Sequence, residues 1–355
     1  MKMCGVSVCY LINIIMKMKK TFLFFALFFA IAHAFFSCNH HSQKYVKNTG
    51  KVHGTYYSAT YQQPKGIDLQ EKLEQRMREF EMSLSTFNKE SIISRINQND
   101  NSVETDYYFE TMYAMAKEVS ERTDGAFDIT VAPLVNAWGF GFGNRERNKT
   151  PDIESILPYI GYNKIRLENH RLAKDDERIM LDASAIAKGY SSDVMAQLLE
   201  ENGCKNYMIE IGGEVKCKGL NPKGEKWKIG INKPIDDEIN TKNEIQVVVG
   251  ISNAGLATSG NYRQFYYLDD KKYSHTIDPR TGYPVNHNLL SVTVIAPTCM
   301  QADAYATAFM VLGKDKAIQI CESIPDMDCF LIYSDENGND ATIYSKGFEQ
   351  YLLKK

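Results

Sequence analysis

A succession of short apolar runs, rich in β-branched and aromatic residues, fills the second half of the chain. They span residues 164–167, 179–182, 207–211, 227–231, 245–251, 263–268, 290–295 and 329–333. Two stretches with helical spacing, residues 185–202 and 301–322, separate them. Strands that follow one another without a helix between them pair antiparallel. The pattern therefore predicts an α+β fold with mainly antiparallel sheets flanked by helices, and it disfavours a doubly wound parallel sheet.

The first half of the folded region predicts one strand and two amphipathic helices. Residues 52–61 alternate like a strand, and Leu69, Leu73, Met77, Phe80 and Leu84 recur at helical spacing. Residues 106–122 predict a second helix, which ends at Thr123-Asp124-Gly125, where glycine can adopt the left-handed cap. For residues 123–143 we expect a helix stop, a short strand and a glycine-rich aromatic turn.

The N-terminus has the pattern of an export signal. Lysines at positions 17, 19 and 20 precede an apolar stretch at residues 22–36, which is followed by Ser37 and Cys38. This order predicts a lipoprotein signal over residues 1–38, a polar tether over 39–50 and one folded domain over 51–355. An uncleaved anchor is the alternative, and Met16 or Met18 could be the true start. Either way the folded body faces outward from the cytoplasmic membrane. We expect an inner-membrane lipoprotein of the cell envelope that faces the periplasm.

Composition excludes two classes of protein. The 355 residues carry a formal net charge of −3 and show no basic stripe, which argues against nucleic-acid binding. The 8 cysteines have no paired CxxC spacing, so neither a zinc site nor a disulfide framework is predicted. Cys204, Cys217, Cys299, Cys321 and Cys329 lie in or beside apolar runs, and we expect them to pack in the core.

Two oxygen-rich segments near the C-terminus are the strongest candidates for chemistry. SHTIDPRTGYPV, residues 274–285, predicts a turn that carries His275, Asp278 and Arg280. MQADAYATAFMVLG, residues 300–313, predicts an apolar helix on which Asp303 and Thr307, four residues apart, share a face. Such a pair suits a hard cation such as magnesium. The competing interpretation is a helix-dipole partner and a core threonine.

Three further segments place polar groups beside turns. Lys188 lies near the start of the helix predicted in LDASAIAKGY, where it either balances a bound anion such as a phosphate or is simply solvated. Asp128 alternates with apolar neighbours, so it either faces solvent or is buried against a donor such as a ligand amide. The glycines of YMIEIGGEVKCKG and LATSGNYRQFYY permit close approach to a ligand, although hairpin bends use the same residues.

These segments, taken in order, resemble one family. GTYYSATY, LSTFNKESIISRIN, TDGAFDITVAPLVNAWGFG, LDASAIAKGY, IGGEV, ATSGNYRQ, HTIDPRTGYPV and ADAYATAFMVLG match the ApbE family, the FAD:protein FMN transferases, in the family's own order. The resemblance extends from about Lys51 to Leu353. It implies a magnesium-dependent enzyme that cleaves FAD, attaches FMN through a phosphoester to a threonine or serine of an acceptor protein and releases AMP. The implied acceptors are subunits of sodium-translocating NADH:quinone reductases and related membrane electron carriers.

The resemblance also implies roles for individual residues. It assigns magnesium to Asp303, Thr307 and the backbone carbonyl of Ala185, and the general base to His275. The implied FAD contacts are His53, Phe87, Ala126, Phe127, Asp128, Asp182, Lys188 and Ile277. Phe87 stands where many relatives carry tyrosine, and His53 stands where methionine is common. Lys188 or Arg280 would help to neutralise the phosphoryl oxygens.

Other functions stay open at this level. A magnesium-dependent FAD pyrophosphatase would use the same site with water in place of the acceptor hydroxyl. A flavin-binding lipoprotein would hold FAD without transferring it, and a structural or adhesive lipoprotein would bind no flavin.

Overall fold

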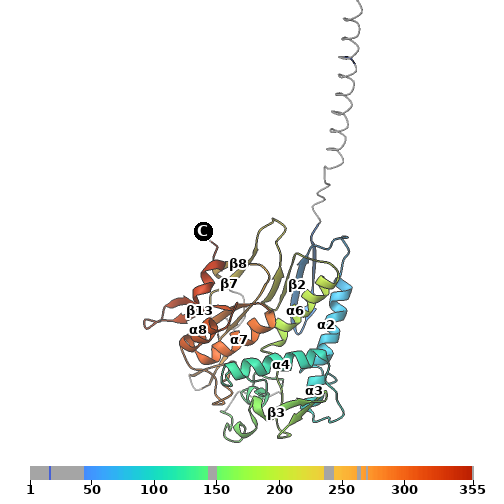
Figure 1. The fold of residues 1–355 in the computed structure, drawn as a ribbon. Helices are drawn as coiled ribbons and strands as arrows, with labels where there is room; N and C mark the ends of the chain where they lie inside the picture. Colours follow the sequence, from blue (N-terminus) through green and yellow to red (C-terminus); the bar gives the residue numbers. More distant parts are fainter. Residues whose placement is uncertain are drawn as a thin grey trace, which may run out of the picture. The chain divides into compact units, whose positions relative to one another are not determined.

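A large antiparallel sheet organises the chain (Figure 1). The computed structural model describes residues 16, 44–142, 150–235, 244–261, 265–268 and 271–353. Within these residues, eight strands pair in the order β1-β2-β5-β6-β9-β12-β13-β14, and every pairing is antiparallel. Their bounds are β1 Val46–Val52, β2 Thr55–Tyr61, β5 Tyr207–Ile211, β6 Glu214–Lys218, β9 Ala254–Gly260, β12 Leu289–Ala296, β13 Asp328–Ser334 and β14 Asp340–Tyr344. The predicted α+β class with mainly antiparallel sheets is confirmed.

Two-stranded ribbons and short helices complete the described part of the unit formed by residues 44–355. The ribbons are β3 Ile165–Glu168 with β4 Arg171–Lys174, β7 Trp227–Asn232 with β8 Ile245–Ile251, and β10 Phe265–Leu268 with β11 Lys271–Ser274. The short helices are α3 Ile92–Asn97, α5 Ala132–Ala137, α8 Lys314–Ser323, η1 Leu157–Tyr159, η2 Tyr162–Lys164 and η3 Lys346–Tyr351.

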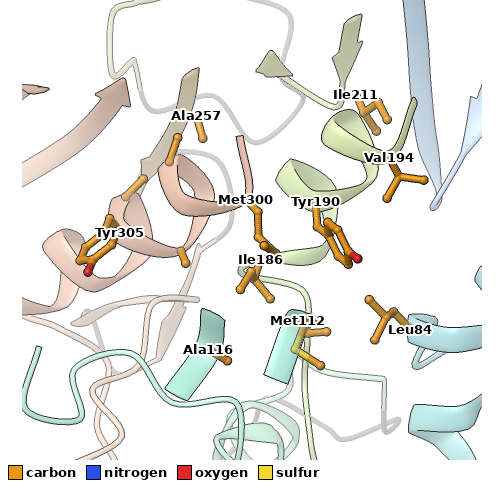
Figure 2. Packing of buried hydrophobic residues seen from close by; sticks show 14 of the residues in the cluster. Leu84, Met112, Ala116, Ile186, Tyr190, Val194, Ile211, Ala257, Met300 and Tyr305 are labelled. Carbon is orange, nitrogen blue, oxygen red and sulfur yellow. The ribbon is translucent and has the colours of Figure 1, made fainter. Parts of the chain in front are cut away.

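Four longer helices form the main core with one face of the sheet. They are α2 Gln70–Leu84, α4 Tyr107–Arg122, α6 Ala187–Glu201 and α7 Cys299–Leu312. Figure 2 shows side chains of these helices, among them Leu84, Met112, Tyr190 and Tyr305, gathered with Ala257 of β9 in one apolar cluster. Complete burial of one such large side chain stabilises the fold by about 1.5–3 kcal/mol.

The opposite face of the sheet is covered by a second apolar cluster. The period of two along a strand sends Ala257 into the main core and its neighbour Leu256 into the second cluster. Trp227 of β7 and Phe348 of η3 pack against that second face. Because both faces are covered, the sheet is fixed in position, and the strand ends and turns at its edge can hold side chains at defined places.

Helices α6 and α7 approach each other closely, and this contact builds the site described below. Asp193 of α6 accepts hydrogen bonds from the backbone N–H groups of Cys299 (3.0 Å) and Met300 (2.8 Å), which satisfies free donors at the start of α7. In return, the N–H of Gly189 in α6 donates to Oδ2 of Asp303 in α7, at 2.9 Å. Each helix therefore supplies a carboxylate that caps the other.

Substituting Gly189 by alanine is expected to destabilise the fold by about 3 kcal/mol or to prevent folding. An added Cβ would lie 2.3 Å from the carbonyl oxygen of Cys299 and 2.7 Å from Cβ of Asp303, and the backbone oxygen cannot move aside alone. Urea unfolding followed by circular dichroism measures the change. Gln197→Ala, on the exposed side of the same helix, is the control, with an expected change within about 0.5 kcal/mol. Equal stability of the two variants would contradict this close packing.

Several expected elements differ at their boundaries. Within residues 52–61, Val52 ends the first strand of a hairpin and the rest form its turn and second strand. His53 and Gly54 have φ values of 51° and 72°, as a tight two-residue turn requires. The expected tether is wrong for residues 46–50, which pair with β2 as part of β1. The expected helix at 301–322 is two helices, separated at Gly313 with φ of 80°.

Two expected strands are absent from the described residues, in segments whose backbone conformation is determined by contacts with distant parts of the chain. Residues 179–182 form only a single bridge, between Met180 and Val131. The expected strand within residues 123–143 is wrong, since the described part of that segment holds helix α5 and turns. Short apolar runs do not by themselves distinguish a buried strand from a buried helical turn.

The predicted export signal and Cys38 lie outside the described residues, together with Cys4 and Cys9. No helix in the described part of the chain is both long and apolar enough to cross a bilayer. The five later cysteines are free and buried, as predicted: Cys204, Cys217, Cys299, Cys321 and Cys329.

Candidate active site

A cavity of about 440 Å³ opens where α6, α7 and the sheet meet several loop segments. It falls within the size range of small-molecule sites. Its lining includes Phe87, Ala126, Phe127, Asp128, Asp182, Ala185, Lys188, His275, Ile277, Asp303 and Thr307. The structure thus brings together site residues predicted from five separate sequence motifs.

Asp303 and Thr307 lie on one face of α7 and both line the cavity, as their spacing predicts. Asp303 is 2% exposed, and its Oδ2 accepts the Gly189 N–H of α6. The carboxylate therefore caps a neighbouring helix and not its own. Thr307 Oγ1 lies 3.2 Å from Oγ of Ser259 in β9, and both residues line the cavity together with Asp303.

Lys188 is not simply a solvated lysine. Its Nζ lies 2.7 Å from Oε1 of Glu214 and 3.9 Å from Oδ1 of Asp303. Burial by itself lowers the pKa of Lys188, but the carboxylates of Asp303 and Glu214 outweigh it and raise the pKa above its ordinary value. The ammonium is therefore charged at neutral pH and stands in the cavity wall as a fixed positive group.

Glu214 is a site residue that sequence reasoning missed. It is the first residue of β6 and is 4% exposed, and its Oε2 is buried without a hydrogen-bond partner among the described residues. Burial raises the pKa of Glu214, which the charge of Lys188 counteracts in part. The available signal was an acidic residue directly after the glycine pair of IGGEV, where a hairpin would turn its side chain toward a ligand.

Asp128 is buried against donors, but the donors belong to the protein. Its Oδ1 accepts hydrogen bonds from the N–H (2.8 Å) and the hydroxyl (2.7 Å) of Thr130. Its Oδ2 accepts the N–H of Tyr162 at 2.7 Å, and burial raises its pKa. The solvent-facing interpretation is wrong. Asp128 fixes the loop that forms this wall, although its side chain still lines the cavity.

The remaining predicted FAD contacts form the walls and rim. Phe87 is 79% exposed and lies at the rim of the cavity. Asp182 accepts the Ser184 N–H at 2.8 Å and so shapes the turn that carries Ala185. The ring of His275 lies edge-on to that of Phe140, with their centroids 6.4 Å apart.

Two candidate residues take other positions. His53 is not part of the cavity lining. It lies in the β1–β2 turn, with Nδ1 3.2 Å from Glu81 and its ring 5.4 Å from that of Phe80. Arg280 pairs with Asp278 in its own turn, through Nε and Nη2 contacts of 2.8 Å each, so it braces the segment that presents His275.

The described lining suits a divalent cation. The lining contains one lysine but four carboxyl side chains, which are those of Asp128, Asp182, Glu214 and Asp303. In addition, Oε2 of Glu214 is buried and has no hydrogen-bond partner among the described residues. Asp303, Thr307 and Ala185 can offer a carboxylate, a hydroxyl and a carbonyl, which are the oxygen ligands magnesium prefers. Among the described residues, no group of three or more His, Cys, Asp or Glu side chains is arranged to hold a metal ion.

Comparison with known proteins identifies the family. The model of the ApbE family matches residues 53–331. The chain belongs to the ApbE family. Among its curated relatives, the FAD:protein FMN transferase of Haemophilus influenzae is 37% identical over 309 residues, which is 83% of this chain and 88% of that protein. The FAD:protein FMN transferase of Escherichia coli K12 is 37% identical over 284 residues, covering 76% and 79% of the two chains.

Solved ApbE structures share the fold. The flavin transferase ApbE of Vibrio cholerae superposes with a TM-score of 0.78 at 35% identity, covering 87% of this chain and 99% of its own. The flavinyl transferase ApbE of Pseudomonas stutzeri gives a TM-score of 0.75 at 30% identity, covering 87% and 97%. Beyond the predicted site residues, the lining includes Thr258, Ser259 and Gly260, which belong to the quoted motif ATSGNYRQ.

Proposed function

We propose that this chain is an FAD:protein FMN transferase that uses magnesium to move FMN from FAD to a threonine or serine hydroxyl of an acceptor protein, with release of AMP. The coarser part of this proposal, a transferase that acts on a flavin, is supported by the names of the curated relatives. The dependence on magnesium, the nature of the bond and the release of AMP are what the family resemblance implies, and the side chains of the cavity are compatible with them.

One observation carries the proposal. Three segments that lie far apart in the chain line the same cavity. The first carries Asp303 and Thr307, the second carries Lys188 and the third carries His275. Phosphoryl transfer needs a metal or other cationic groups at the phosphoryl oxygens and a base near the attacking hydroxyl.

The proposed reaction breaks one phosphorus–oxygen bond and forms another. The acceptor hydroxyl oxygen attacks the phosphorus of the FMN half of FAD, and AMP leaves with the bridging oxygen. His275 takes the hydroxyl proton, because imidazole is the usual base near neutral pH. Bound magnesium, held by Asp303, Thr307 and the carbonyl of Ala185, would neutralise negative charge on the phosphoryl oxygens. Lys188 supplies a further fixed positive charge in the same wall.

A direct assay tests this function. The full chain, solubilised in detergent, is incubated with FAD, magnesium chloride and a threonine-bearing candidate acceptor, and a parallel sample contains EDTA. We expect the acceptor to gain one FMN by mass spectrometry, with AMP released only when magnesium is present. AMP without a modified acceptor in any acceptor tested would favour the pyrophosphatase. Absence of both products would contradict the proposal.

The exposed aromatic ring at the rim allows a prediction about FAD binding. Phe87→Ala is expected to weaken FAD binding about tenfold, because stacking of an aromatic side chain on a flat ring system contributes about 1–3 kcal/mol. Phe87→Tyr should retain the affinity. Quenching of flavin fluorescence measures both, and Tyr107→Ala, which removes a 69% exposed ring outside the cavity lining, is the control. Unchanged affinity in Phe87→Ala would remove Phe87 from the FAD site.

The acceptor and the location belong to the proposal as well. We propose a subunit of a membrane electron-transfer complex, of the sodium-translocating NADH:quinone reductase type, as the acceptor. We also propose that a lipid on Cys38 anchors the chain to the inner membrane, facing the periplasm. Support for both comes from the sequence motifs alone. Metabolic labelling with a fatty acid, in the chain and in Cys38→Ser, tests the anchor: a label that persists in the variant would contradict it.

A further inference from the structure

We propose that Glu214 is a positioning residue for the metal site: it holds the Lys188 ammonium away from Asp303, so that Asp303 Oδ1 stays available to a divalent cation. This inference rests on the proposed function, because it assumes that Asp303 binds the metal. It concerns a residue to which neither the sequence motifs nor the proposed mechanism gives a role.

The distances around Lys188 show which carboxylate holds it. Its Nζ is 2.7 Å from Oε1 of Glu214, a full charge-assisted hydrogen bond, and 3.9 Å from Oδ1 of Asp303, beyond hydrogen-bond distance. The other oxygen of Asp303, Oδ2, accepts the Gly189 N–H. Asp303 thus has one oxygen, Oδ2, that accepts the N–H of helix α6 and one, Oδ1, that lies beyond hydrogen-bond distance of the lysine.

Without Glu214, we expect the Lys188 ammonium to move toward Asp303. Its nearest remaining carboxylate is Asp303, and an ammonium in a partly buried wall gains strongly by direct contact with an anion. Such a contact would occupy a lone pair of Oδ1 and neutralise the charge that attracts a cation. A positive side chain bonded to a metal ligand competes with the metal for that ligand.

Glu214 is built to hold its position. It begins β6 directly after the β5–β6 turn, and its backbone carbonyl accepts a hydrogen bond from Ser192 Oγ of α6 at 3.3 Å. The turn packs against the ion pair, since a Cβ on Gly212 would lie 3.4 Å from both Oε2 of Glu214 and Cδ of Lys188. With a φ of 62°, Gly212 adopts a conformation that other residues rarely take.

Binding of Mn²⁺ alone, read from the electron paramagnetic resonance signal of the free ion, tests the proposal without any turnover. The full chain in detergent is compared with Glu214→Gln, Lys188→Met and the double variant. We expect Glu214→Gln to bind Mn²⁺ about 10–100-fold more weakly, as is usual when a partner of a metal ligand is changed. In the double variant the competing ammonium is gone, so affinity should return to within about threefold of Lys188→Met.

The double variant separates this proposal from its rivals. If Glu214 bound the metal itself or only stabilised the fold, removal of Lys188 would not restore affinity, and that result would overturn the inference. The matched control is Glu200→Gln, which removes a carboxylate paired with Lys218 at 3.0 Å outside the cavity lining and should leave affinity unchanged. A weakening in this control equal to that of Glu214→Gln would also count against the proposal.

Failure of the underlying function is distinguishable. If the unmodified chain and Asp303→Asn bind Mn²⁺ equally, the metal site itself is wrong, and the role of Glu214 falls with it. If Asp303→Asn weakens binding but Glu214→Gln does not, only the positioning role is wrong. Should Glu214→Gln fail to fold, the Mn²⁺ affinity of Lys188→Met decides the question. An affinity equal to or above that of the unmodified chain supports competition between Lys188 and the metal for Asp303, and a tenfold loss contradicts it.

Discussion

Asp303→Asn is expected to lower metal-dependent FMN transfer at least about 100-fold, because a bound metal supplies several kcal/mol of transition-state stabilisation. Asparagine has the same shape, and its side-chain oxygen can still accept the Gly189 N–H that caps α6, so the fold should persist. What is lost is the negative charge that attracts the cation. Initial rates of acceptor modification, measured by mass spectrometry over a range of magnesium concentrations, give the effect.

A buried aspartate elsewhere provides the control for that variant. Asp328 of β13 is 7% exposed and accepts the Ser345 hydroxyl at 2.7 Å, outside the cavity lining. Asp328→Asn therefore makes the same chemical change in a buried site without touching the candidate metal ligands. We expect it to lose some stability but to keep its magnesium-dependent rate. Normal turnover in Asp303→Asn would remove the central piece of the proposed mechanism.

His275→Gln is expected to lower the rate of acceptor modification about 10²–10⁴-fold, which is the usual contribution of a general base. Glutamine keeps a polar side chain of similar reach but cannot take a proton from the acceptor hydroxyl near neutral pH. Because His275 is proposed to act on the acceptor and not on the metal, affinity for FAD and for Mn²⁺ should stay close to that of the unmodified chain. Single-turnover mass spectrometry of the acceptor isolates the transfer step.

The matched histidine is His287, which contacts the last turn of α7. His287 Nε2 lies 2.8 Å from the carbonyl oxygen of Met310, and its side chain is not part of the cavity lining. His287→Gln should leave the transfer rate within about twofold, as surface changes away from a site usually do. If His275→Gln transfers FMN as fast as His287→Gln does, another group takes the proton.

Much of the fold could be predicted because period and composition act locally. The five apolar residues from Leu69 to Leu84 face one core, and α4 begins where Asp106 accepts the N–H of Phe109 at 2.9 Å. The errors fall where distant contacts override a local pattern. The sequence predicts a polar tether at residues 46–50 because they have few apolar side chains. In the structure, β2 supplies backbone hydrogen-bond partners that make these residues a strand.

The candidate site was predicted unevenly for the same reason. Motif resemblance named Lys188, His275, Asp303 and other residues of the lining, whereas His53, assigned with them, lies in a hairpin turn against Glu81. Glu214 stayed unnoticed because its importance comes from a lysine 26 positions away along the chain. Sequence spacing informs about neighbours on one helix or strand, but it gives no distance between side chains on different elements.

By itself, the sequence determined the α+β class, the family resemblance and the shared face of Asp303 and Thr307. Each of these follows from short-range periodicity or from ordered motifs. Only the tertiary structure decided which carboxylate holds Lys188, that Asp303 caps α6 and that Asp128 is satisfied by the protein's own donors. The first two partnerships depend on how α6, α7 and β6 meet, and the third depends on how η2 meets the loop before α5. Burial makes each unmet polar group costly enough to fix the arrangement.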